Sequence, residues 1–193
     1  MNRFFAISLF VFTGFTSAAA AQSTPLAPLE IEAGYNYLHT NAPPKDCGCF
    51  SMNGGEASAA YRLHHSFSAV ALFQGVTNGN VNDQGRSLTL TSYTFGGRYT
   101  YHFADHRLAP FGQVLVGAAH ADGSLYAKGS ASSGSATAFA SSIGGGADVT
   151  LTPRISLRVV QVDYLLTLLP NGVNDRQNNL SVSTGIVFHV GRR

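Results

Sequence analysis

The chain has 193 residues, of which only 11% are charged, and its formal net charge is +2. Soluble globular domains usually carry about 25% charged residues, so this low fraction indicates that much of the exterior faces something other than water. The nearly neutral balance excludes the basic field on which nucleic-acid binding depends.

The first 21 residues have the layout of a secretory signal peptide. A positive charge at Arg3 precedes an apolar run over residues 4–15, and a series of small residues follows up to Ala21. The run is shorter than the roughly 20 residues that a membrane-spanning helix needs. We expect cleavage after Ala21, a short periplasmic lead-in over residues 22–28, and a single domain over residues 29–193.

Two cysteines lie close together in the segment KDCGCF, at Cys47 and Cys49. An exported protein can form disulfides, but a bridge across one residue constrains little chain and tends to be strained. A metal site needs more ligands, and only His39 is near in sequence. The sequence predicts either a small loop disulfide or a pair of unused thiols, and no cofactor.

The rest of the chain alternates between long apolar-patterned runs and turn-forming segments. The eight strands that this pattern predicts cover residues 29–39, 54–63, 67–77, 88–103, 109–120, 136–150, 155–167 and 178–190. Soluble strands commonly have about 5–6 residues, whereas a tilted strand that crosses a bilayer has about 9–11. The predicted strands belong to the longer class.

The connections between these strands alternate strictly between long and short. The long ones are TNAPPKDCGCFSMN, NGNVNDQGRS, ADGSLYAKGSASSGS and LLPNGVNDRQ, and the short ones are HHS, ADHRL and LTPR. An antiparallel up-and-down barrel whose two ends face different compartments produces this order, whereas the crossing connections of a Greek-key sandwich break it. A soluble periplasmic barrel that binds a small apolar ligand shares part of the pattern and is one alternative.

One face of the predicted strands is rich in aromatic rings. In SYTFGGRYTYHF the rings occupy alternate positions, so they all lie on one side of a strand. A membrane barrel turns such a face to lipid, and amphipathic rings settle at the headgroup level. The lipid-facing aromatic girdle is predicted to contain Tyr35, Tyr37, Tyr61, Tyr99, Tyr101 and Phe103.

The opposite face carries charges of both signs. The polar network predicted for the lumen contains Glu32, Glu56, Arg62, Arg98, Asp148 and Arg158. Isolated buried charges are costly, so we expect Glu32 and Glu56 to be tied to Arg62, Arg98 or Arg158 by ion pairs and hydrogen bonds.

The seventh predicted strand breaks the alternation of faces. Arg158 has the opposite parity to Gln161 and Asp163. A bulge inserts one residue and exchanges the two faces of a strand. A bulge near Val159 or Val160 is therefore predicted, because it would place all three polar residues in the lumen.

In these features the chain resembles the small eight-stranded outer-membrane β-barrels of Gram-negative bacteria, the porin-like family typified by the OmpA transmembrane domain. The end of the chain, STGIVFHV, resembles the family's assembly signal through Gly185, Phe188 and Val190, with Val190 where members usually have an aromatic residue. The resemblance implies insertion into outer-membrane lipid by the barrel assembly machinery. It also implies periplasmic termini and four loops outside the cell, free to contact an unknown extracellular ligand.

An eight-stranded barrel is just wide enough for side chains to fill. We therefore expect an integral outer-membrane protein that is not an enzyme, with an envelope-structural or surface-interaction role and at most a narrow pore. The enzymatic alternative is a lipid hydrolase, for which His120, Asp122 and Ser124 near one rim are the candidates. His64 and His65 lie in a short turn, where solvated side chains are expected.

Overall fold

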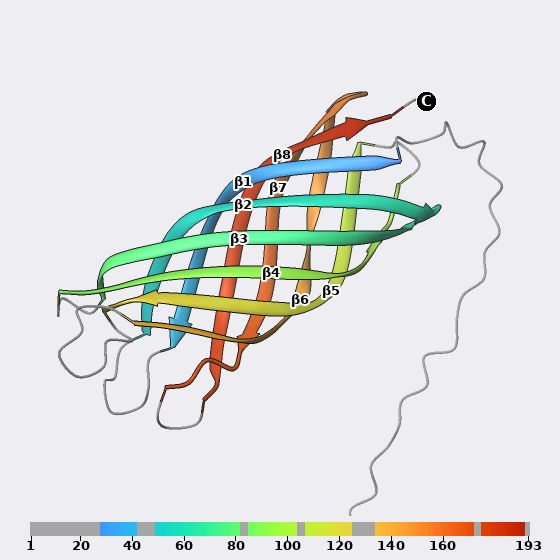
Figure 1. Cartoon of the computed structure of the whole chain (residues 1–193). Coiled ribbons are helices and arrows are strands. Elements are labelled where there is room, and N and C mark those ends of the chain that lie inside the picture. The colour runs from blue at the N-terminus through green and yellow to red at the C-terminus, as the bar shows by residue number, and fades with distance from the viewer. Residues whose placement is uncertain are drawn as a thin grey trace, which may run out of the picture.

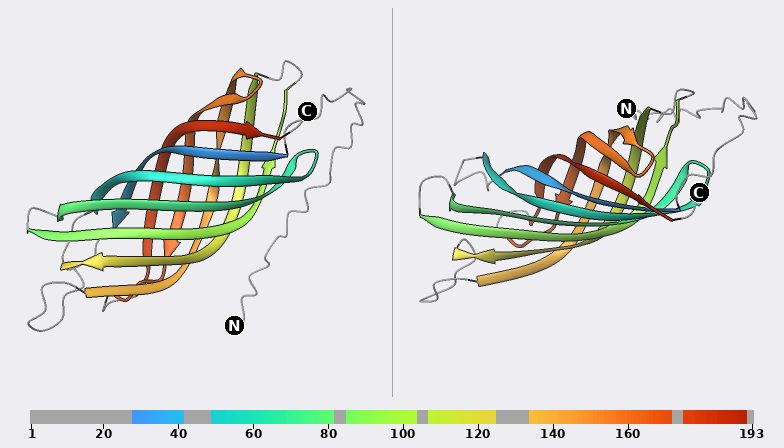
Figure 2. Two further views of the ribbon diagram at one scale, coloured as in Figure 1. Left: turned by 45° about the horizontal axis from the view of Figure 1, so that its top comes forward. Right: turned by 90° about the horizontal axis from the view of Figure 1, so that it is seen from above.

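The computed structural model describes residues 28–41, 49–81, 85–103, 107–124, 134–171 and 175–191. The strands are β1 (Leu29–Asn41), β2 (Cys49–His64), β3 (Phe67–Val81), β4 (Arg86–Thr100), β5 (Leu108–Gly123), β6 (Gly134–Thr152), β7 (Ile155–Thr167) and β8 (Gln177–Val190). Each strand pairs with its sequence neighbours, and β1 pairs antiparallel with β8 to close the barrel (Figures 1 and 2). The predicted fold is confirmed. Within the part of the chain that the structure describes, no helix is long and apolar enough to cross a membrane.

The two ends of the barrel differ as the loop lengths predicted. Two-residue turns join β2 to β3 and β6 to β7, and β8 ends on that side of the barrel (Figure 1). At the opposite end the strands run further than expected. β2 begins at Cys49 rather than residue 54, and β3 ends at Val81 rather than residue 77. Polar residues that the sequence analysis assigned to the long connections therefore belong to strands of the sheet.

The fourth strand is shorter than predicted at its other end. β4 ends at Thr100, so Tyr101 and Phe103 lie beyond it. The Tyr101 amide still donates to the Pro110 carbonyl at 2.8 Å. Proline has no amide hydrogen to return a bond, so the regular ladder between β4 and β5 stops at this point.

A bulge in β7 lies where the sequence predicted one. Arg158 pairs with Gly185, whereas Gln161 pairs with Ser183, so β7 has one residue more than β8 in this interval. Val159 and Val160 are both exposed on the outer wall. The extra residue lets Arg158 and Gln161 point into the lumen from the same strand.

The seam that closes the barrel is built on two facing glycines. Gly34 of β1 lies opposite Gly185 of β8. A Cβ atom on Gly185 would lie 2.5 Å from Oε1 of Glu32 and 2.7 Å from the carbonyl oxygen of Ala33. The carboxylate of Glu32 thus occupies the space that a side chain at Gly185 would need.

Candidate functional site

The outer wall carries the aromatic residues that were predicted for the girdle. Exposed side chains on this wall include Tyr35, Tyr37, Tyr61, Tyr99, Tyr101 and Phe103. Toward the long-loop end, tyrosine hydroxyls meet polar side chains of the neighbouring strand. Tyr35 donates to Oδ1 of Asn53 at 2.5 Å, and Tyr164, which was not among the predicted residues, donates to Oδ1 of Asn178 at 2.5 Å. These hydroxyls mark where the apolar belt ends.

The two faces of the sheet exchange polarity along the barrel axis. On β4 the outward residue Phe95 is 65% exposed, and further toward the long-loop end the outward residue is the hydroxyl-bearing Thr89. Inside the barrel the order is reversed, because buried Ser92 is followed by buried Leu90 and Leu88. One half of the barrel therefore has an apolar exterior and a polar interior, and the long-loop half has a polar exterior and an apolar interior.

Buried apolar side chains close the lumen in the long-loop half, and we call this cluster the plug. The plug consists of Leu38, Phe50, Met52, Val76, Val81, Leu88, Leu90, Ala119, Ala121, Ala140, Leu165 and Leu169. Asn36, Gln74 and Ser92 line a gap together with Leu38 and Leu165 of the plug, and this gap has no room for a water molecule. The sequence interpretation, which expected a polar lumen throughout, missed this plug.

The exchange of polarity predicts where hydrocarbon meets the wall. Because the chain has no tryptophan, single Trp residues report on one position each. We expect the fluorescence of Phe95→Trp to be quenched by lipids brominated on their acyl chains and to lie at shorter wavelength than that of Thr89→Trp. Thr89→Trp should instead be quenched by acrylamide from the water phase. Equal quenching of both variants by brominated lipid would contradict this placement of the boundary.

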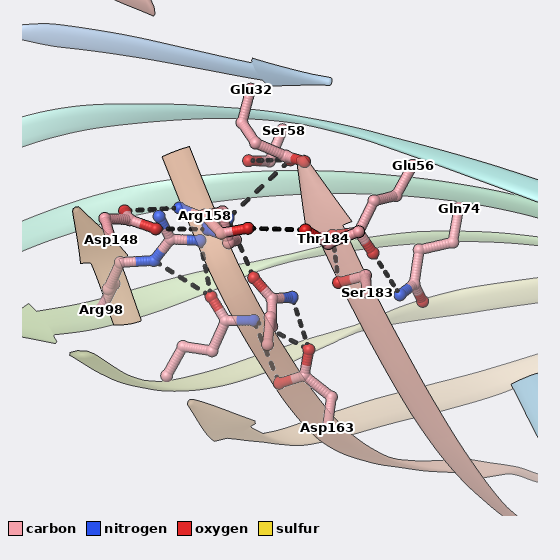
Figure 3. Close-up of polar contacts among 12 residues, drawn as sticks. Glu32, Glu56, Ser58, Gln74, Arg98, Asp148, Arg158, Asp163, Ser183 and Thr184 are labelled. Carbon is pink, nitrogen blue, oxygen red and sulfur yellow. Dashed lines mark hydrogen bonds and ion pairs between the residues drawn. The ribbon is translucent and has the colours of Figure 1, made fainter. Parts of the chain in front are cut away.

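The polar half of the lumen is centred on Arg158, which is fully buried (Figure 3). Its Nε and Nη2 atoms donate to the two carboxylate oxygens of Asp148 at 2.8 and 3.0 Å. Nη1 donates to Oε1 of Gln161 at 2.9 Å and lies 3.8 Å from Oε2 of Glu32. The two parallel hydrogen bonds to Asp148 fix the orientation of the Arg158 guanidinium, and the carboxylate balances its charge.

A second chain of bonds connects Arg98 to Asp163. Arg98 donates twice to Oε1 of Gln113, at 3.1 and 2.8 Å, and Gln113 donates to Oδ1 of Asp163 at 3.1 Å. The guanidinium carbons of Arg98 and Arg158 lie 4.3 and 4.6 Å from the centroid of the Phe111 ring, which is buried in the lumen. The ring face therefore supplies part of the stabilisation that buried cations need.

The two glutamates predicted for the lumen were expected to pair with arginines, but most of their partners are uncharged side chains. Glu56 accepts hydrogen bonds from Ser183 at 2.6 Å and from Gln74 at 3.1 Å, and Glu32 accepts one from Ser58 at 3.0 Å (Figure 3). Of the three arginines proposed for them, only Arg158 reaches Glu32 among the ion pairs of the described residues.

Arg62, the remaining predicted member, lies at the tight-turn mouth of the barrel. It forms an ion pair with Glu30 at 2.8 Å. Glu30 also lies 3.7 Å from Nδ1 of His189, whose Nε2 is 2.8 Å from Oγ of Ser156. Arg62 thus serves a separate contact group that links β7, β8, β1 and β2.

Sequence reasoning placed Gln161 in the lumen but missed Gln74 and Gln113, and it missed that glutamines connect the charges. Gln74, Gln113 and Gln161 are all buried and bridge carboxylates, guanidiniums or hydroxyls. The available signal was their inward parity beside charged residues. Each amide can donate and accept at once, so it can join two acceptors or two charges that lie too far apart for direct contact.

The predicted loop disulfide cannot be placed, because Cys47 lies outside the described residues, while Cys49 is exposed at the start of β2. Within the described ranges, no group of three His, Cys, Asp or Glu side chains could hold a metal ion. In the predicted assembly signal, Phe188 and Val190 are exposed on the outer wall, and Gly185 lies at the seam.

The three candidates for lipid hydrolysis do not form one site. His120 is exposed, and its Nδ1 lies 2.7 Å from Oγ1 of Thr137. Ser124 accepts a hydrogen bond from the amide of Ser87 at 2.7 Å, and Asp122 is exposed. Among the interactions of the described residues, Ser124 and His120 have different partners, so a serine activated by this histidine is not present.

Comparison with known proteins agrees with the architecture. A family model described as the outer membrane protein beta-barrel domain matches residues 7–188. Among curated proteins, none matches this chain in sequence.

Several solved structures share the fold. Neisserial surface protein A has a TM-score of 0.65 at 13% identity, covering 86% of this chain and 99% of that chain. Ail of Yersinia pestis has a TM-score of 0.59 at 15% identity, covering 85% and 99%. The N-terminal barrel of OprF from Pseudomonas aeruginosa has a TM-score of 0.50 at 13% identity, covering 85% and 98%. At these identities the likeness concerns the fold.

Proposed function

Because the chain belongs to the outer membrane protein beta-barrel domain family, we propose that it is a sealed, non-enzymatic barrel. Its role is envelope structure or interaction at the cell surface. The observation that carries this proposal is the double closure of the lumen, by the plug in one half and by the Arg158 network in the other. Among the described residues, the gap where the plug meets the polar half, lined by Leu38, Gln74 and Ser92, has no room for a water molecule.

Planar bilayer recordings test the sealed barrel. We expect wild-type protein to give no conductance steps above the background of the membrane, because the plug excludes water from one half of the lumen. A general porin inserted in the same bilayer provides the positive control. Heat-modifiable gel migration of the recovered protein checks that it was folded. A steady conductance from folded wild-type protein would contradict the proposal.

A serine, a histidine and a carboxylate also meet at the tight-turn end, as they do in a catalytic triad. Ser156 lies near Nε2 of His189, and Glu30 lies near Nδ1 of the same ring. Two features argue against catalysis by this group. Ser156 is only 2% exposed, so a substrate carbonyl has no approach to its hydroxyl. Glu30 is held at 2.8 Å by Arg62, closer than its 3.7 Å separation from His189. The group instead supports a structural link across the β1–β8 seam.

A surface-interaction role is supported by the long-loop end, where the sheet continues beyond the apolar belt around a dry core. One Ail structure was determined in complex with the heparin analogue sucrose octasulfate. In the described part of this chain, exposed Arg86 and Arg176 at that end are balanced by exposed Asp122 and Asp175. Among the described residues, this balance of charge does not itself favour a polyanionic ligand at this end.

Export and assembly complete the proposal. Residues 1–21 would direct secretion, and Gly185, Phe188 and Val190 would present the chain to the assembly machinery. Fractionation of cells that express the full chain should recover it in the outer membrane, with folded protein migrating differently before and after boiling. Recovery in the soluble periplasmic fraction would overturn the proposal and favour the soluble ligand-binding barrel.

A further inference from the structure

The long-loop end of β6 has a paired side and an unpaired side. On one side β6 pairs with β5 up to its first residue, whereas on the other its ladder with β7 stops at Ala140, opposite Thr167. One further bond runs from the amide of Leu168 to the carbonyl oxygen of Phe139, at 3.0 Å. Among the described residues, no strand pairs with residues 134–138 on the side away from β5, and the left view of Figure 2 shows the start of β6 extending past the end of β7. We call this side of residues 134–138 the open edge.

A proline explains why β7 ends where it does. If the register continued, Pro170 would lie opposite Thr137, at the next position where the two strands exchange hydrogen bonds. Proline has no amide hydrogen and cannot donate to the Thr137 carbonyl. The Gln177 side chain accepts from the amide of Leu169 at 3.0 Å and donates to its carbonyl at 2.9 Å, which holds the chain after β7 against the start of β8. The sequence of this segment therefore leaves the edge of β6 open.

Alternate residues of the open edge direct their backbone groups away from β5. The amide of Thr150 donates to the carbonyl of Arg107 on the β5 side, and the register between β5 and β6 is constant, so even-numbered residues of β6 bond to β5. The carbonyl of Phe139 instead accepts from the β7 side. The N–H and C=O groups of Ser135 and Thr137 therefore point to the open side, where the described residues provide no backbone partner.

The open edge lies on the polar part of the wall and has none of the usual protection. Ser135 pairs with Asp122, which pairs with Thr89, so this row of residues lies beyond the apolar belt. Exposed edges of natural sheets are commonly protected by charged residues or proline. Residues 129–147 contain neither. The resemblance places this end of the barrel outside the cell.

We propose that the open edge binds an extended polypeptide segment of a partner protein, which adds to the sheet as a strand beside β6. The backbone of the segment would bond to Ser135 and Thr137. On the outer face of β6 these two side chains are exposed, while Ala136 and Ala138 pack against the plug on the inner face. The segment therefore has polar side chains on its outer face and apolar side chains on its inner face.

A second copy of the chain does not fit the open edge. Two barrels in one membrane are related by a rotation about the membrane normal. Strands tilted by about 35–45° would then cross at about 70–90° and could not run side by side. The inference rests on the surface-interaction role proposed above and gives the partner a chemistry, that of an extended chain with alternating polar and apolar side chains.

Amide hydrogen exchange tests the edge in the free protein. It is measured by NMR on the folded barrel in lipid nanodiscs. The amides of Ser135 and Thr137 should exchange about tenfold faster than those of Ala136 and Ala138, which bond to β5. Slow exchange of all four amides would show that the chain itself covers the edge. Slow exchange that appears only at high protein concentration would assign the edge to a second copy. Either result overturns the inference.

A synthetic peptide of alternating threonine and valine tests the class of partner. Labelled with fluorescein, the peptide should bind the wild-type barrel in nanodiscs, as measured by fluorescence anisotropy, and should slow the exchange of the Ser135 and Thr137 amides. The same peptide methylated at every amide nitrogen has no backbone donors and should bind about tenfold more weakly. If the unmethylated peptide does not bind, or if both peptides bind equally, the inference is wrong.

Two variants at one position provide the matched control. Thr137→Pro removes the N–H that points to the open side and should weaken peptide binding about tenfold. Thr137→Val keeps this N–H but removes the hydroxyl that contacts His120, and it should bind the peptide like wild type. Proline is tolerated where the N–H of an edge strand faces solvent, and heat-modifiable migration checks that both variants are folded.

Equal peptide binding by the two Thr137 variants would overturn the inference, because the backbone donor would then have no part in binding. The conductance measurement does not depend on the open edge. A failure of peptide binding therefore leaves the sealed barrel in place, and conductance by the wild-type protein leaves the open edge in place.

Discussion

Replacement of Arg158 by methionine is expected to lower the free energy of unfolding by about 3–5 kcal/mol, the usual cost of removing one partner from a buried charge network. Arg158 and Arg98 are the two guanidiniums that face four carboxylates in the described polar half of the lumen, those of Glu32, Glu56, Asp148 and Asp163. Without Arg158, Asp148 loses both of its hydrogen bonds to the guanidinium. Urea unfolding in lipid vesicles, followed by heat-modifiable migration, measures the change.

Two variants separate lost charge balance from lost packing. Arg86→Met removes an exposed arginine of β4 and should leave the unfolding midpoint almost unchanged. Asp148→Asn in the Arg158→Met background removes an unpaired carboxylate charge and should recover part of the lost stability. If Arg158→Met is as stable as wild type, the network is not what holds this half of the barrel.

Gly185→Val is expected to destabilise the barrel by about 3 kcal/mol, at the upper end of the range for overpacking. A Cβ atom at this position would meet the carbonyl oxygen of Ala33 and the Cα atom of Gly34, at 2.7 and 2.9 Å, and both belong to the backbone of the neighbouring strand. Backbone atoms cannot rotate away as a side chain can. The seam between β1 and β8 would have to widen, and folding into vesicles should slow.

Gly79→Val is the matched control, because a Cβ atom on Gly79 meets no heavy atom within 4 Å. It makes the same chemical change in a strand but should fold and unfold like wild type to within about 1 kcal/mol. Equal behaviour of the two valine variants would show that the close approach at the seam has no energetic consequence.

The strands and their faces could be predicted because local chemistry determines them. Alternation identified Tyr99 as outward and Arg98 as inward, and the structure leaves Tyr99 57% and Arg98 2% exposed. In β7, Arg158 and Gln161 have opposite parity, and both can face the lumen only if a bulge lies between them. This reasoning located the bulge beside Val159. These features depend on a few neighbouring residues, which a single sequence displays directly.

The interior contacts could not be predicted in the same way. Arg62 and Arg98 were equally good partners for Glu56 by charge, but the register around the ring decides which side chains meet, and Glu56 contacts Gln74 and Ser183 instead. Register accumulates over all eight strand pairs and is not encoded within any one of them.

The plug did have a local signal, which the sequence interpretation overlooked. In the fourth strand the apolar residues change parity between Leu90 and Tyr93. Leu90 is 5% exposed and Tyr93 is 55% exposed. On the outer face, Tyr93 is the last large apolar residue before the long loops, and beyond it the leucines face inward. This change indicates that the strand passes out of the hydrocarbon layer at this point.

Because the outer wall changes from apolar to polar along the barrel axis, the barrel has one favourable depth in the membrane. Two residues along a strand span about 7 Å, and because the strands of a barrel are tilted by about 35–45°, a two-residue shift moves the wall by about 5 Å in depth. Such a shift outward would carry rings such as Phe95 toward water, and a shift inward would draw Thr89 and His120 toward hydrocarbon. A bilayer that is too thick or too thin cannot be accommodated by sliding, so the surrounding lipid must stretch or compress to match the protein.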